Sequence, residues 1–189
     1  YLVTGAAGFI GANYLKYILK KYEDKEDIKV IVVDALTYAG NLGTIREELK
    51  NTKVKFEKVD IRDRKEVERI FSENDVDYVV NFAAESHVDR SIENPQIFLE
   101  TNILGTQNLL ENAKKVWTVS KGENGYPVYR DGVKYLQVST DEVYGSLSKD
   151  YEKAIELVIE DEKVKNVVKN RTNLKTYGDK FFTEKTPLD

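Results

Sequence analysis

Two adjacent acidic residues could carry out proton transfer. Asp141 and Glu142 follow Thr140, just after a strand expected at residues 135–139. A carboxylate pair serves as acid and base when its surroundings keep one group protonated and the other ionised. In a chain with 33 Asp and Glu residues, such a pair is often only a solvated loop. The position after a strand end, where ligands bind in α/β proteins, instead favours a catalytic role.

A glycine-rich turn near the beginning of the sequence could bind phosphate groups. Gly5, Gly8 and Gly11 have the spacing G-x-x-G-x-x-G between an apolar strand at residues 1–4 and a helix expected at residues 9–22. Such a turn lets the backbone approach a pyrophosphate, and the helix N-terminus offers free N–H groups and a positive dipole end. Because glycines also mark any tight strand-to-helix turn, the motif alone decides little.

An acidic residue downstream makes the nucleotide interpretation more specific. Asp34 follows a second expected strand at residues 29–33 and lies 23 residues after Gly11. A carboxylate there accepts hydrogen bonds from ribose hydroxyls and repels a 2′-phosphate. The alternative is that Asp34 only caps a loop. Strand, turn, helix and acid in this register favour dinucleotide binding, and they predict NAD rather than NADP.

Strands and helices alternate along the rest of the sequence. The remaining expected strands cover residues 54–59, 78–82 and 135–139, and the remaining expected helices cover 42–49, 64–71 and 95–116. Residues 121–132 are polar and carry turn signals. Repeated β-α-β units predict an α/β fold with a doubly wound parallel sheet, that is, a Rossmann-type domain.

Composition argues against several classes of function. The net charge is −4 with both signs interspersed, whereas a nucleic-acid surface would show a basic stripe. The absence of cysteine excludes disulfides and thiolate sites, and the only histidine, His87, has no partners for a metal site. No apolar run approaches the ~20 residues that span a bilayer. We therefore expect a cytoplasmic protein with no metal, no membrane and no nucleic-acid partner.

Several segments carry the likeness of one enzyme family. They cover residues 4–11, 34–41, 81–92, 101–106 and 139–145, followed by 182–188. With these segments the chain resembles the extended short-chain dehydrogenase/reductases, and within them the dTDP-glucose 4,6-dehydratases. The glycine turn is shared by the whole superfamily. The Ala-Glu-Ser-His-Val-Asp-Arg-Ser run at 84–91 and the Thr-Asp-Glu triplet at 140–142 are much narrower signals.

The resemblance implies where a cofactor and a substrate would bind. Besides the glycines, the residues implied to contact NAD are Phe9, Ile10, Asp34, Leu36, Thr37, Asp60, Ile61, Ala83, Ala84 and Thr101. Ser86 and Thr140 are implied to contact the nucleotide sugar, and His87 is expected to line the pocket. Asp141 is implied to be the acid and Glu142 the base. Arg90 either pairs with a substrate phosphate or fixes Asp89 or a nearby loop.

The implied activity is the NAD-dependent dehydration of dTDP-glucose to its 4-keto-6-deoxy derivative. Oxidation at C4 acidifies the C5 proton, water leaves across C5 and C6, and reduction at C6 completes the reaction. The alternatives are a nucleotide-sugar 4-epimerase or decarboxylase of the same superfamily or, for this chain alone, a catalytically incomplete NAD-binding module. The helix at 95–116 is implied to form a homodimer interface, although core packing explains its apolar face equally well.

One family motif is missing from its expected place. The superfamily uses a Tyr-x-x-x-Lys pair in the redox step, and among the 12 tyrosines only Tyr17 with Lys21 has this spacing. That pair falls in the first helix, where the family does not place it. We therefore expect the front part of a longer protein that is inactive alone and lacks most of the substrate domain. It would comprise an NAD-binding domain at 1–145, a charged helical insertion at 146–180, and at 181–189 the segment leading to the missing pair.

Overall fold

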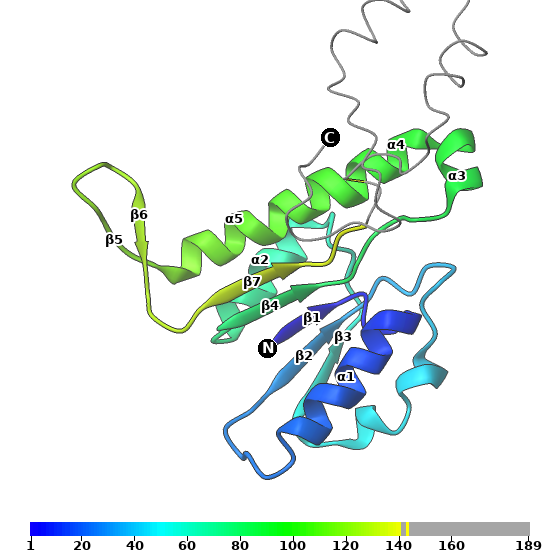
Figure 1. Cartoon of the computed structure of the whole chain (residues 1–189), viewed down its shortest axis with the longest axis horizontal. Helices are drawn as coiled ribbons and strands as arrows, with labels where there is room; N and C mark the ends of the chain where they lie inside the picture. The colour runs from blue at the N-terminus through cyan, green and yellow to red at the C-terminus, as the bar shows by residue number, and fades with distance from the viewer. Residues whose placement is uncertain (141–142, 144–189) are drawn as a thin grey trace, which may run out of the picture. The chain divides into compact units, whose positions relative to one another are not determined.

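The computed structural model describes residues 1–140 and residue 143 (Figure 1). The chain divides into two units, Tyr1–Val138 and Ser139–Asp189, and nearly all described residues belong to the first. The insertion predicted at 146–180 and the segment at 181–189 lie outside the described residues. Within the described part of the chain, no helix combines the length and apolar character that crossing a membrane requires.

A five-stranded sheet with the order β3-β2-β1-β4-β7 forms the centre of the first unit. Its strands are β1 (Leu2–Thr4), β2 (Val30–Val33), β3 (Val54–Glu57), β4 (Tyr78–Asn81) and β7 (Lys134–Gln137). Every neighbouring pair is parallel, so the loops that leave the carboxyl ends gather at one edge. The strand order reverses beside β1, which is where open α/β sheets bind ligands. The predicted α/β fold class is confirmed.

Helices cover both faces of this sheet (Figure 1). Helix α1 (Phe9–Lys21) packs on one face, and helices α2 (Arg64–Glu73) and α5 (Thr106–Trp117) pack on the other. Alternate strand residues point to opposite faces, so Val3 contributes to the α1 face while Leu2 contributes to the α2–α5 face. Burial on both faces explains why Val30–Val33 is a continuous apolar run with all four residues buried.

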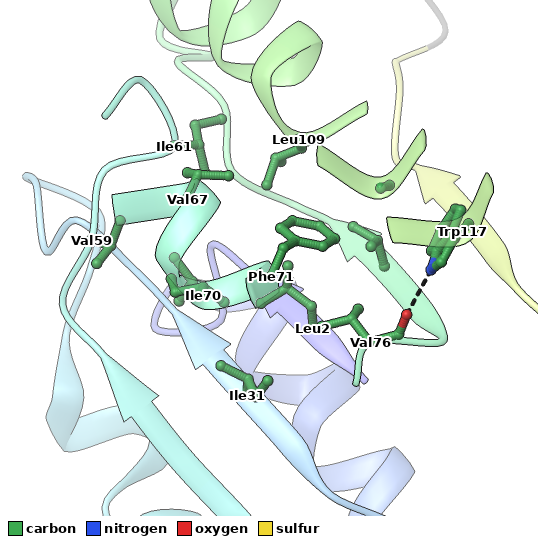
Figure 2. Packing of buried hydrophobic residues seen from close by; sticks show 13 residues of the cluster. Leu2, Ile31, Val59, Ile61, Val67, Ile70, Phe71, Val76, Leu109 and Trp117 are labelled. Carbon is green, nitrogen blue, oxygen red and sulfur yellow. Dashed lines mark hydrogen bonds between the residues drawn. The ribbon is translucent and has the colours of Figure 1, made fainter. Parts of the chain in front are cut away.

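The α2–α5 face holds a core of 13 buried residues (Figure 2). Val67, Ile70 and Phe71 of α2 are buried there, with Trp117 at the end of α5. The indole N–H of Trp117 donates to the backbone oxygen of Val76 at 2.6 Å, which satisfies its polar atom inside the core. Each large apolar side chain buried in this way contributes roughly 1.5–3 kcal/mol to folding.

Two stretches differ from the elements that the sequence predicts. The helix predicted at 42–49 was wrong, because two short 3-10 helices stand there, η1 (Leu42–Ile45) and η2 (Glu48–Lys50). The side chain of Asn41 accepts a hydrogen bond from the backbone N–H of Gly43 and begins a tight turn in place of an α-helix. The polar stretch at 121–132 contributes to an antiparallel hairpin, in which β5 (Thr118–Lys121) pairs with β6 (Pro127–Tyr129).

The helix predicted at 95–116 is interrupted. It consists of α4 (Pro95–Phe98), a π-helical segment η3 (Leu99–Gly105) and α5, and a short helix α3 (Val88–Glu93) precedes it. In a π-helix each backbone hydrogen bond spans one more residue, which widens the turn and re-aims its side chains. Gly105 lies at the end of η3, where an added Cβ would come within 2.7 Å of the Ile61 side chain. The helix thus passes very close to the loop after β3.

Candidate functional site

The turn that follows β1 leaves no room for side chains at two of its glycines. Gly5 has a φ of 63°, and a Cβ there would lie 2.7 Å from the backbone nitrogen of Ala83. A Cβ on Gly11 would lie 2.3 Å from the backbone oxygen of Gly5. Both positions therefore require glycine, and this lets α1 and the segment after β4 approach the turn closely.

Helix α1 begins at this turn with its N-terminus uncapped. Gly8 is the N-cap residue and supplies no side-chain hydrogen bond, and the first turn contains no acidic residue. Phe9 and Ile10, the first two residues of the helix, are 82% and 61% exposed. Free N–H groups and the positive end of the helix dipole suit a pyrophosphate.

Asp34 follows β2 and binds the glycine turn directly. Its Oδ2 accepts a hydrogen bond from the Ala7 backbone N–H at 2.9 Å, and its Oδ1 accepts one from the Leu36 N–H at 2.8 Å. Leu36 has a positive φ of 56°, so the loop folds tightly around the buried carboxylate. Each carboxylate oxygen can accept a further hydrogen bond, which leaves capacity for a ribose hydroxyl.

A buried polar network fixes the ends of the central strands. The Thr4 hydroxyl donates to Oδ1 of Asn81, and the Asn81 amide donates to Oε1 of Gln137 at 2.8 Å. These side chains connect β1, β4 and β7. The backbone N–H of Ala83 also donates to Asn81 Oδ1 at 3.2 Å, so the segment after β4 is held against the turn.

The π-helical segment η3 holds the next part of the β4 loop. The side-chain amide of Asn102 donates to the Glu85 backbone oxygen at 2.8 Å, and its Oδ1 accepts from the Glu85 N–H at 2.9 Å. This two-way contact acts as a clamp on the loop. Thr101, the neighbouring residue, lines a groove at the carboxyl edge of the sheet. π-Helical segments are frequently found at functional sites, which agrees with this placement.

The loop after β3 contributes a charged wall. Arg62 lies 2.7 Å from Asp60 and 3.1 Å from Glu100, measured between guanidinium nitrogens and carboxylate oxygens. Partial burial by itself raises the pKa of Asp60, but the hydrogen bonds from Arg62 outweigh it and hold that pKa below its usual range. Asp60 is therefore ionised at neutral pH, and Arg62 is already paired with two carboxylates.

These segments line one groove at the carboxyl edge of the sheet. It has a cavity volume of about 110 Å³ and is open to solvent. It brings together most of the predicted NAD contacts, namely Gly5, Gly8, Asp34, Thr37, Asp60, Ile61, Ala83, Ala84 and Thr101. Phe9, Ile10, Gly11 and Leu36 are not among its lining residues.

Sequence reasoning missed several lining residues. They are Val33, Ala35, Ala39, Gly40, Val59, Arg62, Phe82 and Glu85. Val33, Phe82 and Val59 lie at or just beyond strand ends, and that position was a signal that could have found them. Arg62 and Glu85 had no such signal, because their place at the groove depends on contacts with residues distant in sequence.

The predicted substrate-binding residues of the β4 loop are exposed. Ser86 and His87 precede α3, and neither lines the groove. His87 is the N-cap residue of α3 and makes no side-chain capping hydrogen bond. Arg90 contacts a nearby loop, because its guanidinium carbon lies 4.0 Å from the centre of the Tyr38 ring. That contact supports the loop-fixing alternative for Arg90.

Two tyrosines bear on the missing redox pair. Tyr17 is more than half exposed on α1 and, like Lys21, is not a lining residue of the groove. Tyr135 on β7 lies near the network, but burial raises its pKa to about 12. A catalytic base needs a lowered pKa. Neither tyrosine is therefore suited to accept the proton of a substrate hydroxyl at this groove.

The remaining predicted site residues, Thr140, Asp141 and Glu142, belong to the second unit, near its beginning. Thr140 belongs to the unit that begins at Ser139, and Asp141 and Glu142 lie outside the described residues. Within residues 1–140 and 143, no group of three His, Cys, Asp or Glu side chains is placed to hold a metal ion.

Known proteins share the fold and much of the sequence. The chain is 45% identical over 146 residues to a dTDP-glucose 4,6-dehydratase of Neisseria meningitidis, covering 77% of this chain and 39% of that protein. A crystal structure of the Streptomyces venezuelae dTDP-glucose 4,6-dehydratase with NAD bound is 42% identical and has a TM-score of 0.64, covering 78% of this chain and 41% of that one.

Two further solved structures mark the range of the likeness. The Bacillus anthracis dTDP-glucose 4,6-dehydratase in complex with NAD has a TM-score of 0.65 at 36% identity, covering 100% of this chain and 43% of that one. A UDP-Glc/GlcNAc 4-epimerase of Campylobacter jejuni has a TM-score of 0.60 at 28% identity, covering 76% and 38%. The chain thus spans less than half the length of the relatives that it matches.

The family assignment follows from the extent of the match. The family model for GDP-mannose 4,6 dehydratase matches residues 2–156, which include the glycine turn, Asp34 and every described segment that lines the groove. The chain belongs to the GDP-mannose 4,6 dehydratase family.

Proposed function

We propose that this chain binds NAD and forms the front part of a dTDP-glucose 4,6-dehydratase. The observation that carries the proposal is the geometry around Asp34, a buried carboxylate that holds the glycine turn beside an uncapped helix N-terminus. The turn suits a pyrophosphate, and the carboxylate suits a ribose without a 2′-phosphate. The dehydratase relatives, two of them crystallised with NAD, support the same cofactor.

In this proposal the cofactor lies along the groove. The turn at Gly5 and Gly8 and the first N–H groups of α1 bind the pyrophosphate. Asp34 and Thr37 face the adenosine ribose, Asp60 and Ile61 face the adenine, and Ala83, Ala84 and Thr101 lie toward the nicotinamide. Bound NAD supplies a hydride acceptor for oxidation at C4 and, once reduced, a donor for reduction at C6.

In the elimination step, the chain's own residues carry out the proton transfers. Glu142 removes the proton at C5, which the ketone at C4 has made acidic, while Asp141 protonates the leaving hydroxyl at C6. This division of work requires the site to keep Asp141 protonated and Glu142 ionised. Thr140, Ser86 and His87 contact the sugar nucleotide. Asp141 and Glu142 come shortly after β7 in the sequence, and ligands bind near the carboxyl ends of strands in such sheets, which supports these roles.

We infer that the chain alone binds the cofactor without turning over the sugar. The support is the lack of a suitable Tyr-x-x-x-Lys pair, since Tyr17 and Lys21 are away from the groove. Because the match covers only 39% of the Neisseria meningitidis relative, we assign the missing groups to the part of such a protein outside the match. We also propose a cytoplasmic location, which the charges of both signs across the sequence support. A homodimer is proposed as well, and the exposed side chains of Leu99, Ile103 and Leu104, between α4 and α5, support it.

Binding and turnover test this function separately. Isothermal titration of the 189-residue chain should show that NAD binds and that NADP binds much more weakly; equal affinity for the two would contradict the role of Asp34. Incubation of the chain with NAD and dTDP-glucose should yield no product by mass spectrometry. A product one water lighter than the substrate would show that the chain is catalytically complete.

A 4-epimerase is the second candidate, and the similarity to the Campylobacter jejuni epimerase favours it. The two activities would convert dTDP-glucose to different products when the longer protein that contains this segment is assayed. A 4-keto-6-deoxy sugar nucleotide supports the dehydratase, whereas a galactose nucleotide of unchanged mass supports the epimerase. The adjacent acids Asp141 and Glu142 favour the dehydratase, since only that reaction eliminates water.

A further inference from the structure

The loop after β2 and helix α3, which follows β4, touch through a pair of side chains. The guanidinium of Arg90, on α3, lies over the ring of Tyr38 with its carbon 4.0 Å from the ring centre. Tyr38 belongs to the loop after β2 and is 51% exposed. Its neighbours Thr37 and Ala39 both line the groove, so the contact lies at the groove's rim.

The sheet order gives this contact its significance. Strand β1 lies between β2 and β4, and the loops after these two strands leave the sheet on opposite sides of it. A contact from the β2 loop to α3 must therefore span the carboxyl end of β1, from which the Gly5 turn departs. The β2 loop is also tied to that turn, because the Asn41 N–H donates to the Ala7 backbone oxygen at 3.0 Å.

Besides the Tyr38 ring, Arg90 also contacts the buried carboxylate of Glu85. Glu85 is only 6% exposed and lines the groove, and its Oε2 has no hydrogen-bond partner among the described residues. The Nε of Arg90 lies 4.0 Å from that oxygen, which is an ion-pair distance but too long for a hydrogen bond. Arg90 thus lies between Glu85 and Tyr38, in contact with both.

We propose that Arg90 and Tyr38 form a clasp across the dinucleotide groove, in which both act as positioning residues that slow the release of bound cofactor. This inference rests on the proposed NAD binding. The clasp joins the loop that holds Asp34 to the segment that carries Ala83–Glu85, and so keeps the two walls of the groove in the arrangement that binds. Pre-organisation of this kind lowers the ordering cost of binding and appears mainly in the dissociation rate.

Stopped-flow release of NADH from the 189-residue chain tests the clasp. Protein loaded with NADH is mixed with excess NAD⁺, and the decay of NADH fluorescence gives the dissociation rate. Arg90→Ala and Tyr38→Ala should each release NADH about two- to fivefold faster, the range expected from an exposed cation–π contact. Tyr38→Phe, which keeps the ring, should release it at the wild-type rate. The double variant should be no faster than the faster single variant, since each change removes the same contact.

Matched controls separate the clasp from general damage. Arg46 is an exposed arginine outside the groove, so Arg46→Ala should leave the rate unchanged. Urea unfolding of every variant should give wild-type midpoints, because Arg90 and Tyr38 lie outside the buried core. If Arg90→Ala proved unstable, Tyr38→Ala against Tyr38→Phe would still decide the question.

The outcomes distinguish this inference from the function on which it rests. A wild-type chain that does not bind NADH would contradict the proposed function. A wild-type chain that binds NADH, with both alanine variants releasing it at the wild-type rate, would overturn the clasp and leave the function standing. Faster release from both alanine variants, with Tyr38→Phe and Arg46→Ala unchanged, supports the clasp.

Discussion

The loop after β1 and the loop after β4 leave the same edge of the sheet and line the same groove, but they are built differently. The first consists of glycine and alanine, with Ala6 and Ala7 buried and its backbone bound by Asp34. The second carries polar and charged side chains, and its residues Ser86 and His87 are exposed. The backbone of this second loop is fixed by the side chains of Asn81 and Asn102.

The difference separates two kinds of requirement. In the β1 loop, space decides which residue is allowed, so a wrong residue should prevent the loop from forming. In the β4 loop, the exposed side chains of Ser86 and His87 contribute little to packing, so substitutions at these two residues should affect what the loop binds rather than whether the domain folds. Four predictions test this contrast, from the largest expected effect to the smallest.

Gly5→Ala should cause the largest loss of stability. The new Cβ would meet the Ala83 backbone at 2.7 Å while holding a φ of 63°. Gly132 provides a matched control, because its φ is 78° but nothing lies within 4 Å of the added Cβ. We expect Gly5→Ala to lower the free energy of unfolding by about 3 kcal/mol and Gly132→Ala by about 1 kcal/mol, measured in urea. Equal losses would mean that close packing does not constrain the turn.

Asp34→Asn should weaken NADH binding with less effect on folding. Loss of the charge weakens the hydrogen bonds to the Ala7 and Leu36 N–H groups and to a bound ribose, and hydrogen bonds to charged groups contribute about 1.5–3 kcal/mol. We expect the Kd for NADH to rise about ten- to a hundredfold and the preference over NADPH to shrink. Exposed Asp24→Asn should change neither value. If Asp34→Asn left the ratio of the Kd for NADPH to the Kd for NADH unaltered, ribose recognition by Asp34 would be ruled out.

Acid should remove the contribution of the pair formed by Asp60 and Arg62. Because the folded pKa of Asp60 is lowered, the pair stabilises the fold fully above the ordinary Asp pKa of about 3.9, and this stability is lost as the pH falls through the lowered value. Solvent screens the partly exposed pair, so Asp60→Asn should cost about 0.5–1 kcal/mol at pH 7 and nothing in strong acid. A cost that stays constant with pH would contradict an ionic origin.

Ser86→Ala and His87→Ala should have the smallest effect on folding. Both side chains are exposed, and surface substitutions of this kind change the free energy of unfolding by less than about 0.5 kcal/mol. In the protein that contains this segment, the same changes should reduce turnover of dTDP-glucose. If either substitution destabilised the domain as much as Gly5→Ala, the contrast between the two loops would fail.

The sequence allowed the β1 region to be predicted because its determinants are local. The run Val30–Val33, the three glycines and Asp34 each act on residues close by in the sheet, and their spacing alone indicates the strand, the turn and the acid. The structure shows in addition that Asp34 accepts a hydrogen bond from the Ala7 N–H of that turn, a contact that the sequence analysis did not predict. The ribose contact itself stays a prediction.

Other parts could not be predicted, because distant residues determine them. The clamp of Asn102 on Glu85 and the bond from Asn81 to Gln137 join separate elements of the fold. The π-helical segment η3 has the apolar spacing of an ordinary α-helix, so the sequence does not distinguish the two. The structural feature that accompanies it is the close approach of Gly105 to Ile61. The hairpin β5–β6 is short and mostly exposed, and its turn signals made the stretch resemble a loop.

The single tryptophan of the chain gives the core its own optical signal. Trp117 is 6% exposed and bonded to Val76, and no other indole contributes to the emission. A red shift of that emission on denaturation would report water entering between α5 and the sheet. Variants at the rim of the groove can thus be followed without an added label. Loss of the folded core would change the emission of Trp117, whereas release of the ligand would change the fluorescence of NADH.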